Sequence, residues 1–117
     1  MAKPAATEVI AGDRAVRVSS PDRVIYPATE HTPEVTKLMV AQYVAAVGEP
    51  LMRAVRERPT ALERWTKGVQ PGMRLGTGRP GEHADAFYQK RVPVGAPDYL
   101  RSCQITFPSG RTASEVC

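Results

Sequence analysis

The chain has 117 residues, which is enough for one small domain and too few for two. No stretch approaches the apolar length that crosses a bilayer, and the first residues lack the apolar core of a secretory signal. Two cysteines make no disulfide framework, and Cys103, Cys117, His31 and His83 stand at no metal-ligand spacing. We therefore expect a reduced, cytoplasmic protein without structural zinc and without a membrane partner.

The net charge of +4 is unevenly distributed. Residues 1–48 carry five basic and five acidic side chains, whereas residues 49–117 carry eleven basic and seven acidic ones. A local excess of Lys and Arg fits a surface that meets a polyanion, because each cation near a phosphate releases condensed counterions. Many small domains of similar charge bind nothing anionic, so charge alone favours no nucleic-acid partner.

The N-terminal residues predict a flexible segment followed by a strand. Residues 1–13 indicate a flexible lead. Alternation over residues 14–20 predicts a strand with Val16 and Val18 facing inward. Pro21 then favours a single helical turn.

The clearest element is a long helix followed by a short one. Thr32 is the expected N-cap and Pro33 the first helical residue, and Gly48 with Pro50 divides the long helix from the short one. Helical spacing predicts one buried stripe along both helices, made of Val40, Val44, Val47 and Leu51.

The second half of the chain indicates strands and loops. Residues 60–65 and residues 86–92 alternate as strands do, and the Gly/Pro-rich residues 71–85 between them indicate a loop. Residues 95–102 indicate one helical turn.

Residues 103–107 and 112–116 flank a Pro-Ser-Gly-Arg turn and predict a hairpin. The order of these elements predicts an α+β fold with a mainly antiparallel sheet and one long and one short helix near the N-terminus.

Within the loop, Gly76, Gly78 and Gly81 match the letters of a dinucleotide-binding turn. That turn works only between a strand and a helix whose first amides meet the pyrophosphate. Here the sequence leads into a strand, so we reject a nucleotide cofactor and expect a flexible loop. Arg74 and Arg79 could still touch a phosphate backbone.

The sequence offers no site that would do chemistry unaided. Metal-dependent nucleotidyl transfer needs two carboxylates aimed at shared ions, and no Asp-x-Asp, Glu-x-Asp or Asp-x-Glu occurs. Glu82 and Asp85 are close in sequence but lie in the loop, a poor platform for catalysis. Cys103 has no nearby His and is interpreted as a small buried hydrophobe.

Binding features are better represented. Strand alternation places Phe87 and Tyr88 on opposite faces, with Lys90 on the face of Tyr88. An aromatic beside cations on an open strand can stack a base while its neighbours meet phosphate. We expect Phe87 in the core and Tyr88 exposed. By position alone, Arg23 and Lys37 are interpreted as solvated surface charges.

Four segments occur in an order that is typical of one family: SSPDRVIYPATEHT, RPTALERWTKGV, AFYQKRVPVGAPDYL and ITFPSGRTASEV. Together they resemble the polymerase domain of bacterial DNA ligase D and its stand-alone primase-polymerase relatives in the archaeo-eukaryotic primase superfamily. The family pattern runs Asp-Lys-x-x-Tyr-Pro, Arg-Pro before a Lys-Arg-aromatic strand, Phe-Phe-x-Lys and Phe-x-Ser-Gly. The likeness runs from about Val16 to the C-terminus.

This resemblance implies roles for particular residues. Arg23 occupies a phosphate-binding Lys position and Lys37 resembles the second such Lys, so both are expected to bind a DNA 5′-phosphate. The chain departs from the pattern where Tyr88 replaces a second Phe and Glu63 replaces a Lys. The remaining implied roles are template stacking by Phe87 and Tyr88 and contact with the DNA backbone by Arg64 and Lys90.

The resemblance also implies a nucleotidyltransferase that uses Mn or Mg and nucleoside triphosphates, but the family's metal-binding and triphosphate-binding residues lie downstream of the matched region. We therefore expect residues 14–117 to be the N-terminal portion of such a domain. It would bind 5′-phosphorylated DNA ends or gaps in end joining, hold no cofactor and be inactive alone. Expected partners are the missing C-terminal half, a ligase or an end-binding protein. A stand-alone interaction module and a non-functional truncated product remain alternatives.

Overall fold

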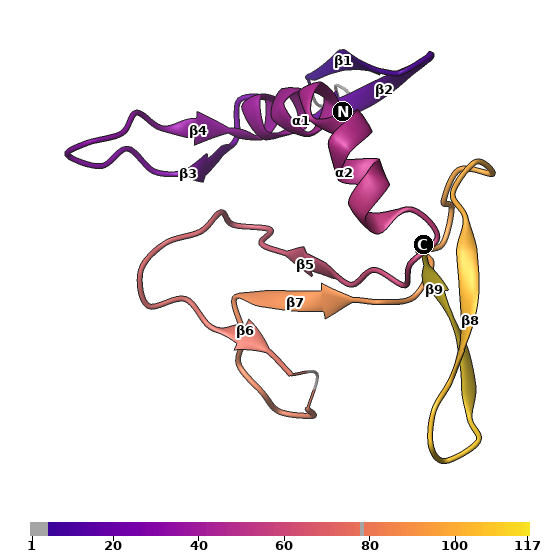
Figure 1. Cartoon of the computed structure of the whole chain (residues 1–117). Helices are drawn as coiled ribbons and strands as arrows, with labels where there is room; N and C mark the ends of the chain where they lie inside the picture. The colour runs from indigo at the N-terminus through magenta and orange to yellow at the C-terminus, as the bar shows by residue number, and fades with distance from the viewer. Residues whose placement is uncertain (1–4, 78) are drawn as a thin grey trace. The chain divides into compact units, whose positions relative to one another are not determined.

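The computed structural model describes residues 5–77 and 79–117 and has the α+β architecture that the sequence predicts (Figure 1). The chain forms two compact units. The N-terminal unit comprises Met1–Leu51 and Trp65–Met73, and the C-terminal unit comprises Met52–Arg64 and Arg74–Cys117. Both contain small sheets whose strands are mostly antiparallel. Across the described residues, no helix is both long and apolar enough to traverse a membrane.

The N-terminal unit begins with a hairpin of β1 (Ala6–Ala11) and β2 (Arg14–Ser19). The strand predicted over residues 14–20 is confirmed, and Val18 is buried, with 7% of its surface exposed, but the expectation that Val16 also faces inward is wrong, because Val16 is 37% exposed. The flexible lead predicted over residues 1–13 is wrong where the structure describes it, because every residue of β1 pairs with β2. Residues 1–4 of that lead lie outside the described residues. Gly12, at φ 62, supplies the positive φ that a two-residue hairpin turn requires.

A second hairpin precedes the first helix. Strands β3 (Val24–Tyr26) and β4 (Val35–Thr36) pair antiparallel, so the helical turn predicted after Pro21 is replaced by a tight turn and a strand. Helix α1 (Lys37–Ala46) begins four residues later than predicted. Its N-cap is Thr36 and not Thr32, and the Thr36 Oγ1 accepts a hydrogen bond from the Met39 amide at 3.3 Å. Pairing with β3 holds the residues just before the cap in extended form.

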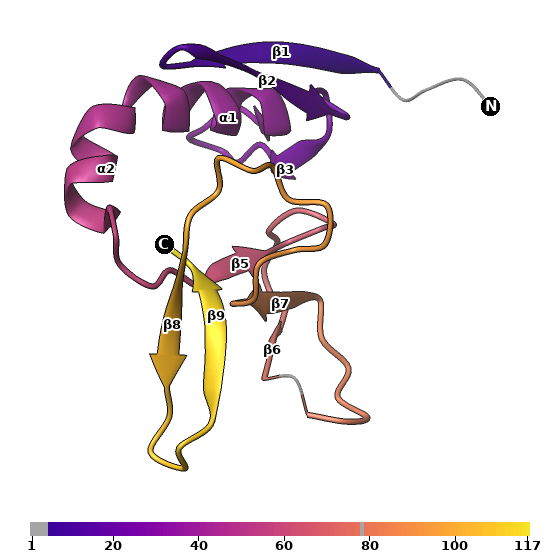
Figure 2. The same ribbon diagram turned by 90° about the vertical axis from the view of Figure 1, so that its right-hand side faces the viewer.

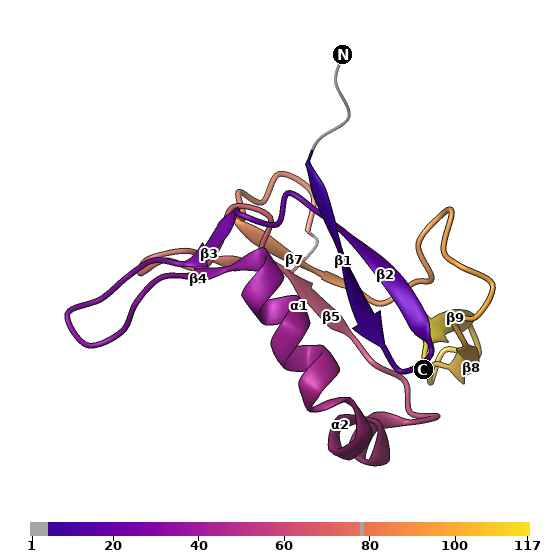
Figure 3. The same ribbon diagram turned by 90° about the horizontal axis from the view of Figure 1, so that it is seen from above.

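The predicted division into two helices is confirmed, since α2 (Gly48–Val55) follows α1 directly. The predicted buried stripe is wrong: neither helix has a buried residue, and Val44 and Leu51 are 45% and 38% exposed. Apolar residues surround α1 on all sides, so its sequence defines no single inward face. Figure 3 shows α1 lying along the β1–β2 hairpin, with the β3–β4 hairpin leading into its first turn.

The segment Trp65–Met73 returns to the N-terminal unit and packs on β3. The Val69 amide donates to the Ile25 carbonyl at 2.7 Å, and the Gly68 amide donates to the Trp65 carbonyl at 3.1 Å. Gly68 has φ 83, and a Cβ atom at this position would lie 2.8 Å from the Ile25 oxygen. Only glycine fits this turn without strain.

In the C-terminal unit, β5 (Leu62–Arg64), β6 (Leu75–Gly76) and β7 (Ala86–Gln89) form a sheet in the order β5-β7-β6. The strands predicted over residues 60–65 and 86–92 are present but shorter. The loop predicted over residues 71–85 contains β6, which pairs parallel to β7. Gly76 makes this pairing possible, because a Cβ atom there would lie 2.7 Å from the Ala84 Cβ and 3.1 Å from the Ala86 oxygen.

The predicted C-terminal hairpin is confirmed by β8 (Ser102–Thr106) and β9 (Thr112–Val116), which Figure 2 shows side by side. The helical turn predicted over residues 95–102 is a tight turn, closed by the Leu100 amide on the Pro97 carbonyl at 3.1 Å. The hairpin joins the three-stranded sheet through the Thr60 amide, which donates to the Val116 carbonyl at 2.8 Å, and through a bridge between Arg91 and Glu115.

The close approach at Gly68 gives a stability prediction. Gly68→Ala should lower the free energy of unfolding more than Gly72→Ala does. Both glycines have positive φ, but no atom lies within 4 Å of the Cβ position at Gly72. We expect a loss of about 1 kcal/mol for Gly72→Ala and roughly 2–3 kcal/mol for Gly68→Ala. Urea unfolding followed by the fluorescence of Trp65, the single tryptophan, measures both. Equal losses would show that the contact with Ile25 has no energetic role.

Candidate nucleic-acid interface

Pairing of β3 with β4 brings Arg23 and Lys37 together. The Lys37 amide donates to the Arg23 carbonyl at 2.8 Å, one step along the ladder from the Val24 and Thr36 pair. The next amide of α1, that of Leu38, donates to the Pro21 carbonyl at 3.0 Å. Two cations that are separated in sequence therefore share one edge of the N-terminal unit, at the first turn of α1.

The turn that carries Arg23 is fixed at both ends. Ser20 has φ 50, an uncommon value for a residue other than glycine. Its amide donates to the Ala5 carbonyl at 3.0 Å, and its carbonyl accepts from the Arg23 amide at 3.1 Å. These hydrogen bonds join the turn to the end of the β1–β2 hairpin and set the position at which β3 begins.

The side chains of Arg23 and Lys37 donate hydrogen bonds to uncharged acceptors. Arg23 is exposed, and its Nη1 donates to the Thr66 carbonyl at 3.2 Å. Lys37 is half-buried, and its Nζ donates to the Ser19 carbonyl at 2.6 Å and to the Ser19 hydroxyl at 3.2 Å. A carbonyl or hydroxyl oxygen orients a cation without neutralising it, so these contacts leave both positive charges available to an anion. The side chains reach different partners although their backbones adjoin.

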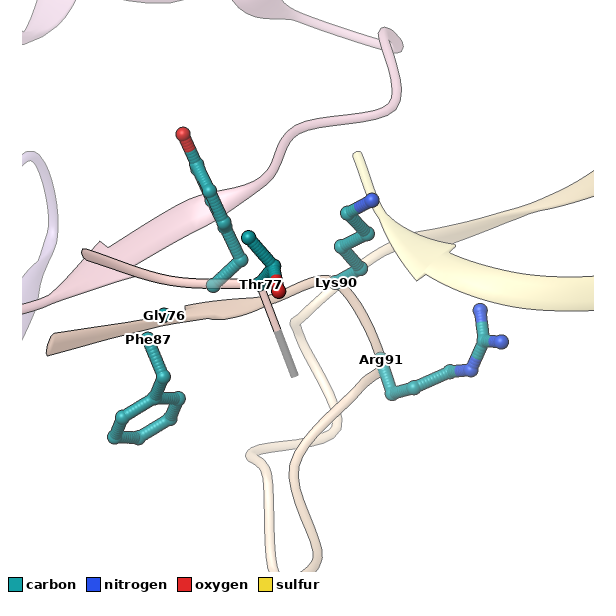
Figure 4. A pocket seen from close by; sticks show the side chains of 6 residues that line it. Gly76, Thr77, Phe87, Lys90 and Arg91 are labelled. Atoms are coloured by element: carbon teal, nitrogen blue, oxygen red, sulfur yellow. The ribbon is translucent and has the colours of Figure 1, made fainter. Parts of the chain in front are cut away.

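In the C-terminal unit, β7 carries aromatic side chains on both faces. Figure 4 shows the Phe87 ring and the Lys90 side chain on opposite sides of the strand, as alternation predicts. Phe87 is 48% exposed and Tyr88 is 47% exposed. The expectation that Phe87 is a core residue is therefore wrong, because alternation assigns faces but does not tell which face is covered. Both rings are open enough to stack on a base.

Arg64 lies beside Phe87. The two residues are direct partners in the β5–β7 ladder, and the Arg64 Nη1 donates to the Gln89 Oε1 at 2.7 Å. Gln89 follows Phe87 by two positions, so it lies on the same face. The neutral amide holds the guanidinium next to the ring without cancelling its charge.

Tyr88 lies opposite Glu63 in the same ladder. Partial burial raises the pKa of the Tyr88 hydroxyl, and the neighbouring Glu63 carboxylate raises that pKa further by its charge and by accepting a hydrogen bond from the hydroxyl. Tyr88 and Glu63, the two positions at which the resemblance implies a departure from the family pattern, are thus direct partners. The sequence contains both residues, but only the strand register shows that they meet.

An open hollow of about 580 Å³ lies along β6 and β7 (Figure 4). Arg91 at its rim is 3.9 Å from the Glu115 carboxylate, and Glu115 is buried. The residues that line the hollow are Gly76, Thr77, Phe87, Tyr88, Lys90 and Arg91. Of these, Gly76 and Thr77 come from the Gly-rich loop, in which the sequence had suggested only Arg74 and Arg79 as phosphate contacts.

The Gly-rich loop is held by its own carboxylates. Glu82 Oε2 accepts hydrogen bonds from the Thr77 amide at 2.7 Å and the Thr77 hydroxyl at 3.1 Å. Asp85 Oδ2 accepts from the Arg74 amide at 2.9 Å. A strand, and not a helix, follows the loop, as expected; Gly78 of the motif lies outside the described residues. Glu82 and Asp85 therefore act as structural acceptors for backbone amides.

The described residues do not fit the metal ions that the family resemblance implies. Over residues 5–77 and 79–117, no three His, Cys, Asp or Glu side chains gather where they could bind one ion. Cys103 is half-buried, and burial together with the neighbouring Cys117 and Glu115 raises the pKa of its thiol, which keeps it protonated and weakly nucleophilic. We derive no metal-dependent or covalent step from these residues.

Comparison with known proteins identifies the family. The sequence model described as "LigD, primase-polymerase domain" matches residues 36–117, and the chain belongs to this family. The match includes Lys37, Arg64, Phe87 and Tyr88, whereas Arg23 precedes it.

Curated relatives agree with this assignment. The multifunctional non-homologous end joining protein LigD of Mycolicibacterium smegmatis is 31% identical over 97 residues, which is 83% of this chain and 10% of that protein. The LigD proteins of Mycobacterium bovis and Mycobacterium tuberculosis are each 30% identical over 103 residues, 87% of this chain and 11% of theirs. The chain thus spans about a tenth of the length of these relatives.

The contact between Tyr88 and Glu63 gives a prediction about pH. Tyr88 should keep its proton to a higher pH than an ordinary tyrosine, whose pKa is about 10. Glu63→Gln removes the carboxylate charge, so the pKa of Tyr88 should fall but stay above the ordinary value, because burial remains. NMR titration of the Tyr88 ring carbons measures the change, and Asp98→Asn in the same unit is the control. An unchanged pKa in Glu63→Gln would contradict the contact.

Proposed function

We propose that this chain is the DNA-end-binding portion of a LigD-type polymerase domain that acts in non-homologous end joining. Arg23 and Lys37 bind the 5′-phosphate of a recessed end or gap. The single observation that carries the proposal is the hydrogen bond from the Lys37 amide to the Arg23 carbonyl, which joins the two cations at one edge. The names of the relatives, which are non-homologous end joining proteins, support it.

The local chemistry suits a phosphate. A guanidinium has five N–H donors, and among the described residues Arg23 uses one of them, on the Thr66 carbonyl, so the others are available for a bidentate contact. Lys37 is the first residue of α1, and the first turn of that helix contains no acidic residue. The positive end of the helix dipole therefore adds to the two side-chain charges.

The β5-β7-β6 sheet supplies a second surface for the same ligand. An exposed aromatic ring beside a cation is the usual way to hold single-stranded nucleic acid without sequence preference. We propose that Phe87 and Tyr88 stack on template bases and that Arg64 and Lys90 contact the backbone. The two surfaces belong to different units of the chain, so we treat them as separate subsites.

We further propose that more polypeptide, in the same chain or in a separate one, completes the domain. Val18 and Ala86 are the buried hydrophobic side chains among the described residues, whereas large apolar side chains such as Ile10, Tyr43 and Leu62 are 65%, 65% and 42% exposed. The favoured partner is the C-terminal half of a primase-polymerase domain, which would also supply the carboxylate pair that this sequence lacks. Catalysis, with Mn or Mg and nucleoside triphosphates, would then belong to the completed domain.

The phosphate subsite is tested with recessed DNA ends that differ only in the 5′-phosphate. We expect the chain to bind the phosphorylated end about tenfold more tightly than the hydroxyl end. Arg23→Ala should remove this preference and flatten the salt dependence of log K by about one unit. Arg23→Lys should keep part of the preference. Fluorescence anisotropy at several salt concentrations measures both quantities.

Arg56→Ala is the matched control, because it removes one positive charge at a position outside the subsite. It should weaken binding to both ends alike and keep the preference for the phosphate. If the chain bound phosphorylated and unphosphorylated ends equally, or if Arg56→Ala removed the preference as Arg23→Ala does, the phosphate subsite would be wrong.

A further inference from the structure

The two faces of the β5-β7 ladder differ in charge. Residues that are direct partners in an antiparallel ladder share a face, and the faces alternate along the strand. Arg64 and Phe87 are partners on one face, which we call the Phe87 face. Glu63 and Tyr88 are partners on the other, which we call the Tyr88 face. Two rings of similar exposure therefore have neighbours of opposite charge.

On the Phe87 face, the neighbour of the ring attracts a polyanion. Arg64 is exposed, and its Nη1 donates to the neutral amide of Gln89 at 2.7 Å. A strand whose base stacks on Phe87 would bring its phosphates to a cation that is already oriented, so little side-chain entropy is lost on binding. This face has the arrangement that single-strand binding requires.

On the Tyr88 face, the neighbour of the ring repels a polyanion. Glu63 is the direct ladder partner of Tyr88, so its carboxylate lies beside the ring, close enough that, after burial, it further raises the pKa of the Tyr88 hydroxyl. Lys90 follows Tyr88 by two positions and lies on the same face, so the only cation of this face that the two strands supply stands beside a carboxylate in the same ladder. A phosphodiester that approached this ring would meet a fixed negative charge and a hydroxyl that is already engaged.

We propose that Glu63 is a specificity-determining residue that confines single-stranded nucleic acid to the Phe87 face of the sheet. It does so by engaging the Tyr88 hydroxyl and repelling the phosphate backbone from the Tyr88 face. This inference rests on the proposed function, because it assumes that the sheet binds a polynucleotide. It deepens that function by assigning the strand to one of two available rings.

The test compares the two rings with and without the carboxylate. Phe87→Leu and Tyr88→Leu keep an apolar side chain and remove the ring on which a base could stack. In the unmodified chain, Phe87→Leu should weaken binding to a short oligo-dT about tenfold, since a stacked base is lost, and Tyr88→Leu should change it less than twofold. In Glu63→Gln, the affinity for oligo-dT should rise about fivefold, because the repelling charge is gone. When Tyr88→Leu is added to Glu63→Gln, binding should weaken, because the Tyr88 ring can then stack on a base.

Asp98→Asn is the matched control, because it removes one negative charge from an exposed turn of the same unit. It should raise affinity less than Glu63→Gln and should leave Tyr88→Leu without effect. Anisotropy at fixed salt gives the affinities, and far-UV circular dichroism of each variant shows that it folds.

The outcomes separate the two proposals. If Tyr88→Leu weakened binding of the unmodified chain as much as Phe87→Leu, or if Glu63→Gln changed affinity no more than Asp98→Asn, Glu63 would not select a face and the end-binding function would stand. If the unmodified chain bound neither oligo-dT nor phosphorylated ends, both proposals would be overturned.

Discussion

The pairing of β3 with β4 is the interaction on which the candidate phosphate subsite depends. It brings Arg23 to Lys37 through the backbone, and it ends at Thr36, the residue that caps α1. The start of the helix and the position of both cations are therefore set by one short ladder. The return segment reinforces it, because the Val69 amide bonds to β3 at Ile25. A shift of this ladder's register by one residue would move the cap of α1 and would also separate Arg23 from Lys37.

Local patterns predicted those elements that local interactions determine. Alternation correctly indicated the strand at residues 14–20 and the hairpin near the C-terminus, because side-chain period and turn chemistry act within a few residues. The start of α1 could not be found in this way. Thr32, followed by Pro33, is the better cap by local sequence, but pairing of β4 with β3 keeps the chain extended as far as Thr36 and moves the cap there. The same reason explains β6, which exists only because β7 lies beside it.

For the candidate site, too, the sequence predicted some features and only the fold revealed others. Family resemblance predicted that Arg23, Lys37, Phe87 and Tyr88 matter, and strand alternation placed the two rings on opposite faces. Neither could reveal that Arg23 reaches Thr66 or that Lys37 reaches Ser19, because both contacts join segments that come together only in the fold. Glu82 shows the converse case. Its place in a Gly-rich loop argued against catalysis, but only the structure shows that it closes the loop on Thr77.

Glu63 and Tyr88 are direct partners in the β5–β7 ladder and so act on each other. A tyrosine hydroxyl opposite a carboxylate can donate to it, which a phenylalanine ring could not do. The carboxylate raises the pKa of that hydroxyl, so near neutral pH the hydroxyl remains a donor and the pair as a whole carries one negative charge. This charge faces the side of β7 that bears Lys90, while Arg64 remains on the other side with Phe87. The sheet therefore keeps two aromatic rings, and on our proposal a polyanion that needs both a ring and a cation binds on the face where Arg64 is the ladder partner of Phe87.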